Sequence, residues 1–228
     1  MTSNIIVHHL EQSRSHRIVW LLELLKMPYE IKEYKRNPTT RLAPPELKEI
    51  HPLGKAPVIQ DGDRTVAESG AIIMYLMEKE NKLMPAIGTQ ERVQFHYWMH
   101  YAEGSLMPPL LMGLVFNTIP TKAPFFLRPI LRPVFDKVMD SFVTPQLNDH
   151  TKMIEDHLGK NKWFAGGEEI TGADVQMSFP LEALYMWNTN KNGKEGCTNI
   201  ANYLERIKQL PSYKAAEERG GELNISKI

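Results

Sequence analysis

The chain has 228 residues, 42% of them hydrophobic and 24% charged, which is the composition of a folded globular protein rather than a disordered one. Acidic and basic residues number 27 each, so nucleic acid is not expected as a partner, because phosphate backbones are bound by basic surfaces. Cys197 is the only cysteine, which excludes a disulfide framework and a cysteine-based metal site and agrees with a reducing cytoplasm.

Neither a signal peptide nor a membrane span is expected. The first apolar stretch, 5–10, is too short and too polar for a signal peptide. The apolar run AIIMYLM at 71–77 is far below the ~20 residues that a membrane-spanning helix needs. We therefore expect a soluble, cytoplasmic protein without a membrane span.

The first third of the chain alternates between strand and helix patterns. Strand patterns cover 4–10 and 29–35, and between them apolar residues recur every three or four positions, which predicts a helix. Two further strands joined by an Asp-Gly turn are predicted over 57–67, followed by a helix over 71–81. The order is βαβ and then ββα, which predicts a mixed sheet with one parallel pair.

The pattern changes after this point. Residues 82–89 (KLMPAIGT) lack periodicity and end in Thr89, a helix-start residue. We therefore place a domain boundary here, with an α/β domain over 1–83 and an all-helical domain over 90–228. Thr171 and Asp174 form a capping box at the start of a later helix, with a structural role.

Prolines are expected to shape the helical part. Pro108 and Pro109 are expected to bend or interrupt its first long helix. Four more prolines predict a loop-rich segment after it: Pro120, Pro124, Pro129 and Pro133.

Two serines lie directly before the first helix, in the sequence EQSRSHR at 11–17. Serine is an ordinary residue of helix starts, where its hydroxyl caps backbone N–H groups. A serine hydroxyl at a helix start is also well placed for chemistry. The pattern alone leaves both roles open for Ser13 and for Ser15.

Three segments together resemble the glutathione transferase superfamily. They are SRSHRIVWLLELLKMPYE (13–30), HPLGKAPVIQDGDRTVAESGAIIMYL (51–76) and ITGADVQMSFPLEAL (170–184). The resemblance implies a thioredoxin-like N-terminal domain that binds glutathione and an all-α domain that contributes the pocket for an electrophile. It also implies a homodimer with glutathione as co-substrate and no metal.

The family's glutathione site implies roles for residues next to Pro57 and for two cations. A cis-proline, Pro57, accompanies Ala56, whose main-chain groups pair with the cysteine of glutathione as an added strand would. The glycine carboxylate of glutathione needs a cation, for which Lys55 and Arg41 are the candidates. A plain turn proline and solvated cations are the alternatives for these residues.

The resemblance places the γ-glutamyl end of glutathione at Glu68 and Ser69. Both lie where a helix begins, and the N–H groups of a helix N-terminus attract anions. Ser69 would bind the carboxylate, and Glu68 would accept from the ammonium. An ordinary helix cap uses different atoms, so both roles are compatible.

The chain resembles the serine-type members of the family, in the theta-like group of fungal and bacterial sequences. The first strand ends without a tyrosine, and Cys197 lies in the helical domain. Ser13 matches the catalytic serine of those members, so we expect Ser13 to donate a hydrogen bond to the glutathione sulfur and Ser15 to cap the helix. The thiolate then attacks a small electrophile, and reduction of peroxides by the same thiolate is a further implied activity.

The electrophile pocket is expected between the domains. Its candidate lining residues, for which core or dimer contacts are the alternative, are Tyr101, Met107, Met112 and Phe116. His96 and His100 have the i, i+4 spacing of a zinc site, but no glutamate stands between them, so interdomain packing is the preferred interpretation.

Two alternative functions remain from the sequence. The first is a glutathione-binding module of the same fold that acts in interaction or regulation without catalysis. The second is a peripheral membrane role for the segment APFFLRPILRPVF at 123–135, which has large apolar residues and two arginines. A bent helix between the domains is the simpler explanation of that segment.

Overall fold

The structure is a computed structural model, and it describes residues 4–192 and 196–225. Its elements in chain order are β1 (Ile5–Leu10), α1 (His16–Leu25), β2 (Tyr29–Tyr34), α2 (Leu47–Ile50), β3 (Val58–Asp61), β4 (Arg64–Ala67), α3 (Ser69–Glu80), α4 (Gln90–Tyr101), the π-helical turn η1 (Ala102–Leu106), α5 (Met107–Lys122), α6 (Arg128–Val138), the π-helical turn η2 (Met139–Val143), α7 (Thr144–Leu158), α8 (Gly172–Asn192), α9 (Thr198–Lys208) and α10 (Pro211–Gly220).

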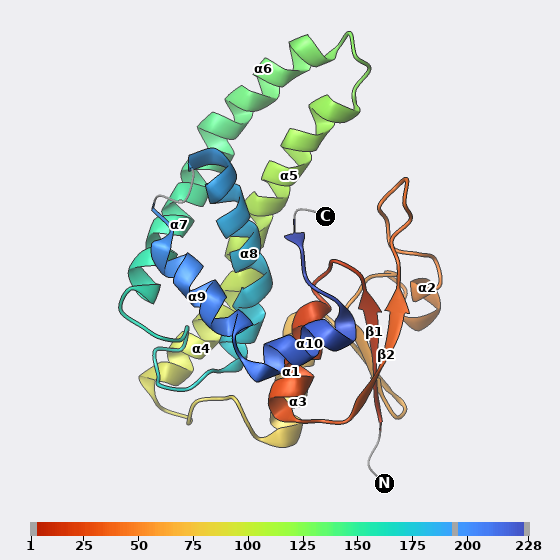
Figure 1. Cartoon of the computed structure of the whole chain (residues 1–228), viewed down its shortest axis with the longest axis vertical. Helices are drawn as coiled ribbons and strands as arrows, with labels where there is room; N and C mark the ends of the chain where they lie inside the picture. Colours follow the sequence, from red (N-terminus) through yellow and green to blue (C-terminus); the bar gives the residue numbers. More distant parts are fainter. Residues whose placement is uncertain (1–3, 193–195, 226–228) are drawn as a thin grey trace.

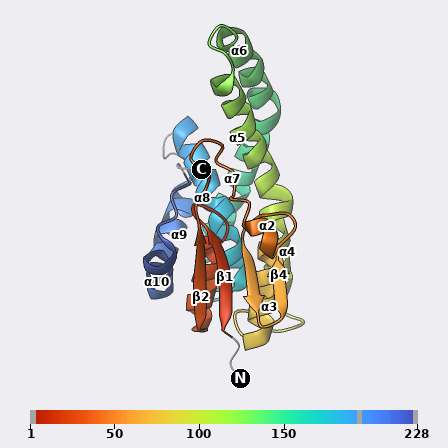
Figure 2. The same ribbon diagram turned by 90° about the vertical axis from the view of Figure 1, so that its right-hand side faces the viewer.

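The first four strands form one mixed sheet in the order β2-β1-β3-β4 (Figures 1 and 2). Strand β1 runs parallel to β2 and antiparallel to β3, and β3 and β4 form a hairpin. Gly62 adopts a φ of 60° in the hairpin turn, a conformation that suits glycine. The predicted order βαβ–ββα and the all-helical remainder are confirmed, and the fold is thioredoxin-like in its first domain.

Helix α1 is buried on all sides rather than on one face. Five consecutive residues from Ile18 to Leu22 are completely buried. The helix packs against α3, and against α8 and α10 of the helical part, so the apolar residues on every side have partners (Figure 1). This burial ties the sheet domain to the helical domain and fixes the position of the segment that precedes α1.

The prediction of a loop-rich segment from Pro120 to Pro133 is wrong, because most of these residues are helical. Helix α5 continues through Pro120 to Lys122, and α6 begins at Arg128 and contains Pro133. Pro129 lies in the first turn of α6, where a backbone N–H has no intrahelical partner to lose. Pro108 and Pro109 likewise lie in the first turn of α5, directly after the π-helical turn η1. Pro108, Pro109 and Pro129 therefore lie at helix starts, whereas Pro120 and Pro133 lie within helices that continue past them.

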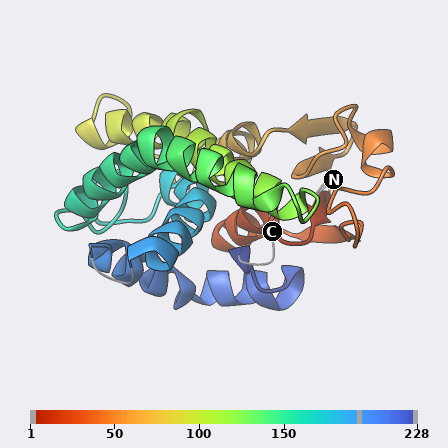
Figure 3. The ribbon, with the colours of Figure 1, turned by 90° about the horizontal axis from the view of Figure 1, so that it is seen from above.

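Helices α5 and α6 form a hairpin that projects from the rest of the molecule (Figures 1 and 3). No residue of α6 is buried, so the segment 123–135 is not the helix between the domains that the sequence favoured. Within the described residues, no helix has the combined length and apolar character needed to cross a membrane.

Two helix starts are capped as the sequence predicted. Thr89 accepts a hydrogen bond from the backbone N–H of Arg92 at the start of α4. At the start of α8, Thr171 accepts from the N–H of Ala173, and the Asp174 carboxylate accepts from the N–H of Thr171 at 2.8 Å. Both capping predictions are confirmed.

Candidate active site

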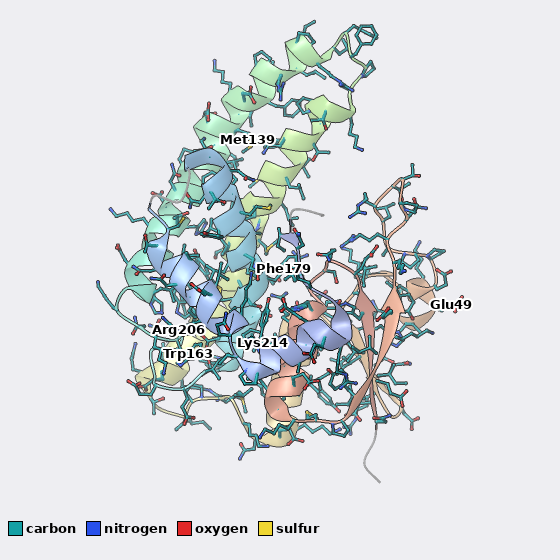
Figure 4. All side chains as sticks on the ribbon, in the orientation of Figure 1. Glu49, Met139, Trp163, Phe179, Arg206 and Lys214 are labelled. Atoms are coloured by element: carbon teal, nitrogen blue, oxygen red, sulfur yellow. The ribbon has the colours of Figure 1, made fainter. Side chains whose placement is uncertain are left out.

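A cavity of about 980 Å³ lies between loops of the sheet domain and helices α5 and α8. Its sheet-domain wall includes Ser13, Lys55 and Ala56, and its helical wall is largely apolar. Phe179 and Met139, two residues of the helical wall, lie apart along the helical domain, so the cavity extends from α8 toward the base of the hairpin (Figure 4). The cavity can therefore hold a polar ligand on one side and an apolar one on the other.

Ser13 lies on the cavity wall in the turn between β1 and α1, and it is only 5% exposed. Its Oγ donates to the carbonyl oxygen of Leu10 at 2.8 Å and accepts from the backbone N–H of Ser15 at 3.2 Å. The second contact fixes the oxygen while the hydrogen remains free to rotate about the Cβ–Oγ bond. The hydroxyl can thus exchange the Leu10 carbonyl for an acceptor in the cavity.

Ser15 occupies the N-cap position of α1, but the prediction that its side chain caps the helix is wrong. Its backbone already has helical angles (φ −67°, ψ −21°), and its hydroxyl makes no capping hydrogen bond. Instead, Ser15 Oγ accepts from the N–H of Leu10 and contacts Nδ1 of His9 at 2.9 Å. Ser15 is completely buried and binds β1 rather than the helix.

The hydroxyls of Ser13 and Ser15 lie 2.8 Å apart and continue to His9, so three side chains form one buried chain. Burial lowers the pKa of His9, although hydrogen bonds with the backbone of Gly220 and Ser15 oppose this effect. The Cε1–Nε2 edge of the ring lies against Gly220. With the proton on Nε2, a neutral His9 accepts the Ser15 hydroxyl at Nδ1, which leaves Ser13 as the hydroxyl nearest the cavity.

A second polar chain runs from the cavity wall to the start of α3. Arg14 lines the cavity, and its Nε donates to both carboxylate oxygens of Glu103 at 3.1 and 3.2 Å. Glu103 also forms an ion pair with Arg17. Arg17 is 1% exposed and donates to Ser69 Oγ at 2.5 Å and to the carbonyl oxygen of Gln176. The chain therefore couples the cavity, α3 and α8.

The charges of this chain stabilise one another. Burial lowers the pKa of Arg17 to about 10, while its ion pair with Glu103 opposes the shift, so the guanidinium stays charged at neutral pH. Burial alone favours the neutral carboxyl of Glu103, but the charges of Arg17 and Arg14 outweigh it and lower the pKa of that group. Glu103 lies in the π-helical turn η1, and such turns often mark functional positions.

The segment before Pro57 forms a further part of the cavity wall. The Ala56–Pro57 peptide bond is cis, and Lys55 and Ala56 both line the cavity. Arg41 does not belong to the lining among the described residues. Arg36 does, and its guanidinium donates to the carbonyl oxygens of Glu11, Gln12 and Arg41.

Glu68 has a positive φ of 69° at the N-cap position of α3. A non-glycine residue rarely adopts this conformation, and such strain concentrates at functional sites. Glu68 is exposed, whereas Ser69 beside it is 5% exposed and is held by Arg17. Neither residue lines the cavity among the described residues; Ser69 ends the polar chain that runs from Arg14 through Glu103 and Arg17.

The four residues expected to line the electrophile pocket lie in different places. Met107 lines the cavity. Met112 and Phe116 are partly buried against the core, and the Phe116 ring packs near Phe135. Tyr101 is buried and lines a separate depression on α4 and α7, where its hydroxyl hydrogen-bonds to His150.

Several residues in or next to the cavity are not marked by a sequence motif. Arg14 stands between the two serines, in a segment whose hydroxyls are the more obvious candidates for chemistry. Glu103 and Arg36 belong to no motif. Trp187 and Lys191, one helical turn apart on α8, also line the cavity. Their i, i+4 spacing on a long apolar helix was the available signal.

The described residues contain no candidate metal site. Across residues 4–192 and 196–225, no group of three or more His, Cys, Asp or Glu side chains is placed to hold an ion. His96, one of the two histidines at zinc-like spacing, accepts a hydrogen bond from Nε of Arg92 at 3.1 Å.

Comparison with known proteins agrees with these features. Residues 3–78 match the model of the glutathione S-transferase N-terminal domain, and residues 118–211 match that of the C-terminal domain. Glutathione S-transferase 1 of Saccharomyces cerevisiae is 32% identical over 93% of this chain and 94% of its own length. Glutathione S-transferase 3 of Schizosaccharomyces pombe is 35% identical over 94% of this chain and 87% of its own.

A solved glutathione S-transferase from Actinobacillus pleuropneumoniae is 36% identical, with a TM-score of 0.75 over 98% of this chain and 96% of that one. A glutathione transferase family member from Pseudomonas fluorescens, solved with two glutathione molecules bound, shares the fold at 22% identity and a TM-score of 0.72, over 95% of this chain and 93% of that one. The chain belongs to the glutathione S-transferase family and is a glutathione transferase.

Proposed function

We propose that the cavity binds glutathione with its sulfur at Ser13 and that the resulting thiolate attacks a small electrophile held by the helical wall. The observation that carries the proposal is the position of Ser13: its hydroxyl lies on the cavity wall at the start of α1, and Lys55 and Ala56 lie on the same wall. Ser15 is buried away from the cavity by His9 and Leu10.

Each end of glutathione has a candidate partner. Main-chain groups of Ala56 pair with the cysteine residue. Lys55 and Arg36, which line the cavity, supply positive charge for the glycine carboxylate in place of Arg41, which does not line it. Ser69 and Glu68 at the N-terminus of α3 bind the γ-glutamyl group, where helix N–H groups favour a carboxylate. Arg17 supports this end, because its hydrogen bond to Ser69 Oγ orients that hydroxyl.

The chemistry is stabilisation of a thiolate. A free thiol has a pKa near ~8.5, so it is mostly protonated at neutral pH. A hydrogen bond from Ser13 and the positive end of α1 favour the ionised form. The thiol proton leaves to solvent, the sulfur forms a bond to the electrophilic carbon, and the leaving group departs with its electron pair. The same thiolate would attack the O–O bond of a hydroperoxide.

The helical wall suits apolar electrophiles. Its side chains include Met107, Leu110 and Phe179, and Arg14 stacks near the Phe179 ring at 5.2 Å. The methionine side chain adapts to ligands of different shape. We therefore expect a broad preference for apolar compounds rather than strict recognition of one.

The test is the Ser13→Ala variant, assayed for conjugation of glutathione to an aryl halide and for reduction of a hydroperoxide. Loss of a hydrogen bond to a charged sulfur should lower kcat/KM roughly 10- to 100-fold at pH 7. It should also raise the pH of half-maximal kcat/KM by about one unit, since one pKa unit corresponds to ~1.4 kcal/mol.

Ser15→Ala is the matched control, because it removes a hydroxyl of the same turn that does not reach the cavity. A Ser15→Ala protein with the larger pH shift would reverse the assignment. A wild-type protein that binds glutathione but conjugates neither substrate would favour the non-catalytic binding module instead.

We also propose that the protein works as a homodimer in which the outer faces of α4 and α7 participate. Val93, Tyr97 and Met153 line the depression on these helices and are 59%, 46% and 36% exposed. Apolar side chains exposed together are typical of a contact surface. Light scattering should give twice the chain mass for the wild type, and Val93→Glu should shift it toward the monomer.

A further inference from the structure

The outer half of the α5–α6 hairpin carries apolar side chains that contact no core. Phe125 is 80% exposed, Phe126 62%, Ile130 66% and Val134 56%. We call these four residues the hairpin tip. Phe125 and Phe126 lie on the turn 123–127, at the outer end of the hairpin, and Ile130 and Val134 lie on α6, which runs back from that turn (Figures 1 and 2).

The exposure extends over α6 and the turn before it and is not limited to one side chain. No residue of α6 is buried, and the two phenylalanine rings contact each other edge to face at 5.7 Å. Side chains around the end of the hairpin extend away from the ribbon on its open sides (Figure 4). Single exposed apolar residues are common, whereas a continuous set on a projecting element indicates an interaction surface.

Positive charges outnumber negative ones around the hairpin tip, and the nearest carboxylate along α6 is Asp136. From Gly104 to Phe135 the sequence contains no aspartate or glutamate. It contains three cations in that range, Lys122, Arg128 and Arg132, and all three are exposed in the structure. The chain as a whole is neutral, so this segment carries a local excess of positive over negative charge beside large apolar side chains.

We propose that the hairpin tip docks on the surface of an anionic phospholipid membrane, with Phe125 and Phe126 inserted among the headgroups and acyl chains. Aromatic and aliphatic residues beside arginines are the chemistry of interfacial binding, in which apolar insertion and attraction to anionic lipids act together. The docking does not depend on the glutathione chemistry.

A second copy of the chain fits this surface less well. Two hairpin tips in contact would bring Arg128 and Arg132 of each copy against the same cations of the other. The carboxylate nearest to them along α6, Asp136, lines the cavity. Like charges brought together at an interface oppose association, whereas an anionic lipid surface offers the opposite charge.

Docking in this way would place the cavity near the source of apolar compounds. Leu111 and Leu114 of α5 line the cavity and are 44% and 47% exposed, and the same helix continues outward to the turn that bears the hairpin tip. Apolar electrophiles dissolve in the membrane, so an enzyme held at its surface meets them at a higher local concentration.

The test is flotation of the full chain with phosphatidylcholine vesicles that contain 30% phosphatidylserine, compared with vesicles of phosphatidylcholine alone. We expect the wild type to float with the anionic vesicles at low salt. The bound fraction should fall at least threefold with neutral vesicles and again when the salt is raised to about 0.5 M, since salt screens surface charges.

Two variants and their controls separate the contributions. Phe125→Ser with Phe126→Ser should lower binding at least fivefold, and Arg128→Gln with Arg132→Gln should lower it at least threefold and weaken its salt dependence. Ile87→Ser, at a residue 90% exposed in the loop before α4, and Lys35→Gln with Lys160→Gln, at exposed lysines elsewhere, should change binding less than twofold.

All substituted positions are exposed, so circular dichroism and the melting temperature should match the wild type. Wild-type protein that stays with the soluble fraction, or hairpin-tip variants that float as well as the wild type, would overturn the proposal. A halved mass of the phenylalanine variant in light scattering, with vesicle binding unchanged, would assign the surface to a second copy instead. Conjugation activity without vesicles should be unchanged, which separates this proposal from the function of Ser13.

Discussion

Helices α1 and α8 both begin after hydroxyl side chains, yet the two starts use them differently. At α8, the side chains of Thr171 and Asp174 bind the backbone: each accepts a hydrogen bond from an N–H group of the helix start. At α1, the Ser15 hydroxyl makes no capping bond, and Ser13 Oγ accepts only the N–H of Ser15, ahead of the helix. Both hydroxyls contact each other, and between them they bind His9 and the end of β1. A hydroxyl that is not needed as a cap remains available for a ligand, so changes at α8 should affect folding and changes at α1 should affect chemistry.

The largest expected effect is that of Asp174→Ala. The carboxylate is completely buried and accepts from the N–H groups of Phe164 and Thr171 and from the Tyr203 hydroxyl, at 2.8 to 2.9 Å. Its removal leaves buried donors unpaired, each at ~1–3 kcal/mol, so the free energy of unfolding should fall by roughly 3–5 kcal/mol. Urea denaturation measures this, with the exposed Asp156→Ala as control. Equal stability of the two variants would contradict the role of Asp174.

A second effect concerns pH at the start of α1. Burial lowers the pKa of His16 to about 3, and His9 and Lys208 add to the shift. The unfolded chain takes up this proton near its ordinary pKa of ~6.5, whereas the folded chain does not, so stability is present above pH 6.5 and is lost as the pH falls toward 3. Between pH 7 and 5 this residue should account for about 2 kcal/mol.

The measurement is the difference in unfolding free energy between pH 7 and pH 5, by urea denaturation of wild type and His16→Phe. The ring replacement preserves the contact with Tyr213, whose ring lies 5.2 Å away, and removes the buried Nε2, which has no partner. The variant should lose less stability on acidification by about 2 kcal/mol, whereas His100→Phe, at an exposed histidine, should behave as the wild type. An unchanged pH dependence in His16→Phe would show that other groups cause the acid sensitivity.

Thr171→Ala should change the unfolding free energy less than Asp174→Ala does, and less than acidification does through His16. It removes one cap from a helix start that is buried, so we expect a loss of ~1 kcal/mol or more in unfolding free energy and unchanged kcat/KM in the protein that remains folded. Thr89→Ala provides the comparison, because Thr89 caps α4 at a half-buried site, whereas Thr171 is buried, and the change should cost less. A Thr171→Ala protein with full stability and no activity would contradict the structural role of α8.

The parts of this fold that follow from local pattern were predictable. The alternation of β2, the periodicity of α1 and the Asp-Gly turn between β3 and β4 all express the environment of single elements, and the sequence carries that environment directly. The prolines of α5 and α6 were misjudged because a proline's effect depends on its position in the helix. At the first turn, where Pro129 lies, it costs no intrahelical hydrogen bond, whereas Pro120 and Pro133 lie within helices that continue past them.

The site was predictable only where a motif marked it. Ser13, Lys55 and Ala56 lie in segments that resemble the family, and they line one cavity. The ion pairs of Arg14 and Arg17 with Glu103 join residues 89 and 86 positions apart in the sequence, through a π-helical turn. Nothing in the local pattern marks such a partner. The prediction that Ser15 caps α1 was wrong for the same reason. Its hydroxyl contacts His9, which lies on the neighbouring strand β1.

The smallest effect on chemistry should be that of Ser15→Ala, and it sharpens the contrast between the two helix starts. This change leaves Nδ1 of His9 and the N–H of Leu10 without their hydroxyl partner, so the unfolding free energy should fall by roughly 1 kcal/mol. The Ser13 hydroxyl keeps its place, because the backbone N–H of Ser15 still donates to its oxygen. Steady-state kinetics of conjugation should therefore show kcat/KM within about threefold of the wild type, with the pH of its midpoint unchanged. A loss as large as that of Ser13→Ala would mean that the two serines and His9 act as one unit, and α1 would then begin with a catalytic chain rather than a single donor on a structural support.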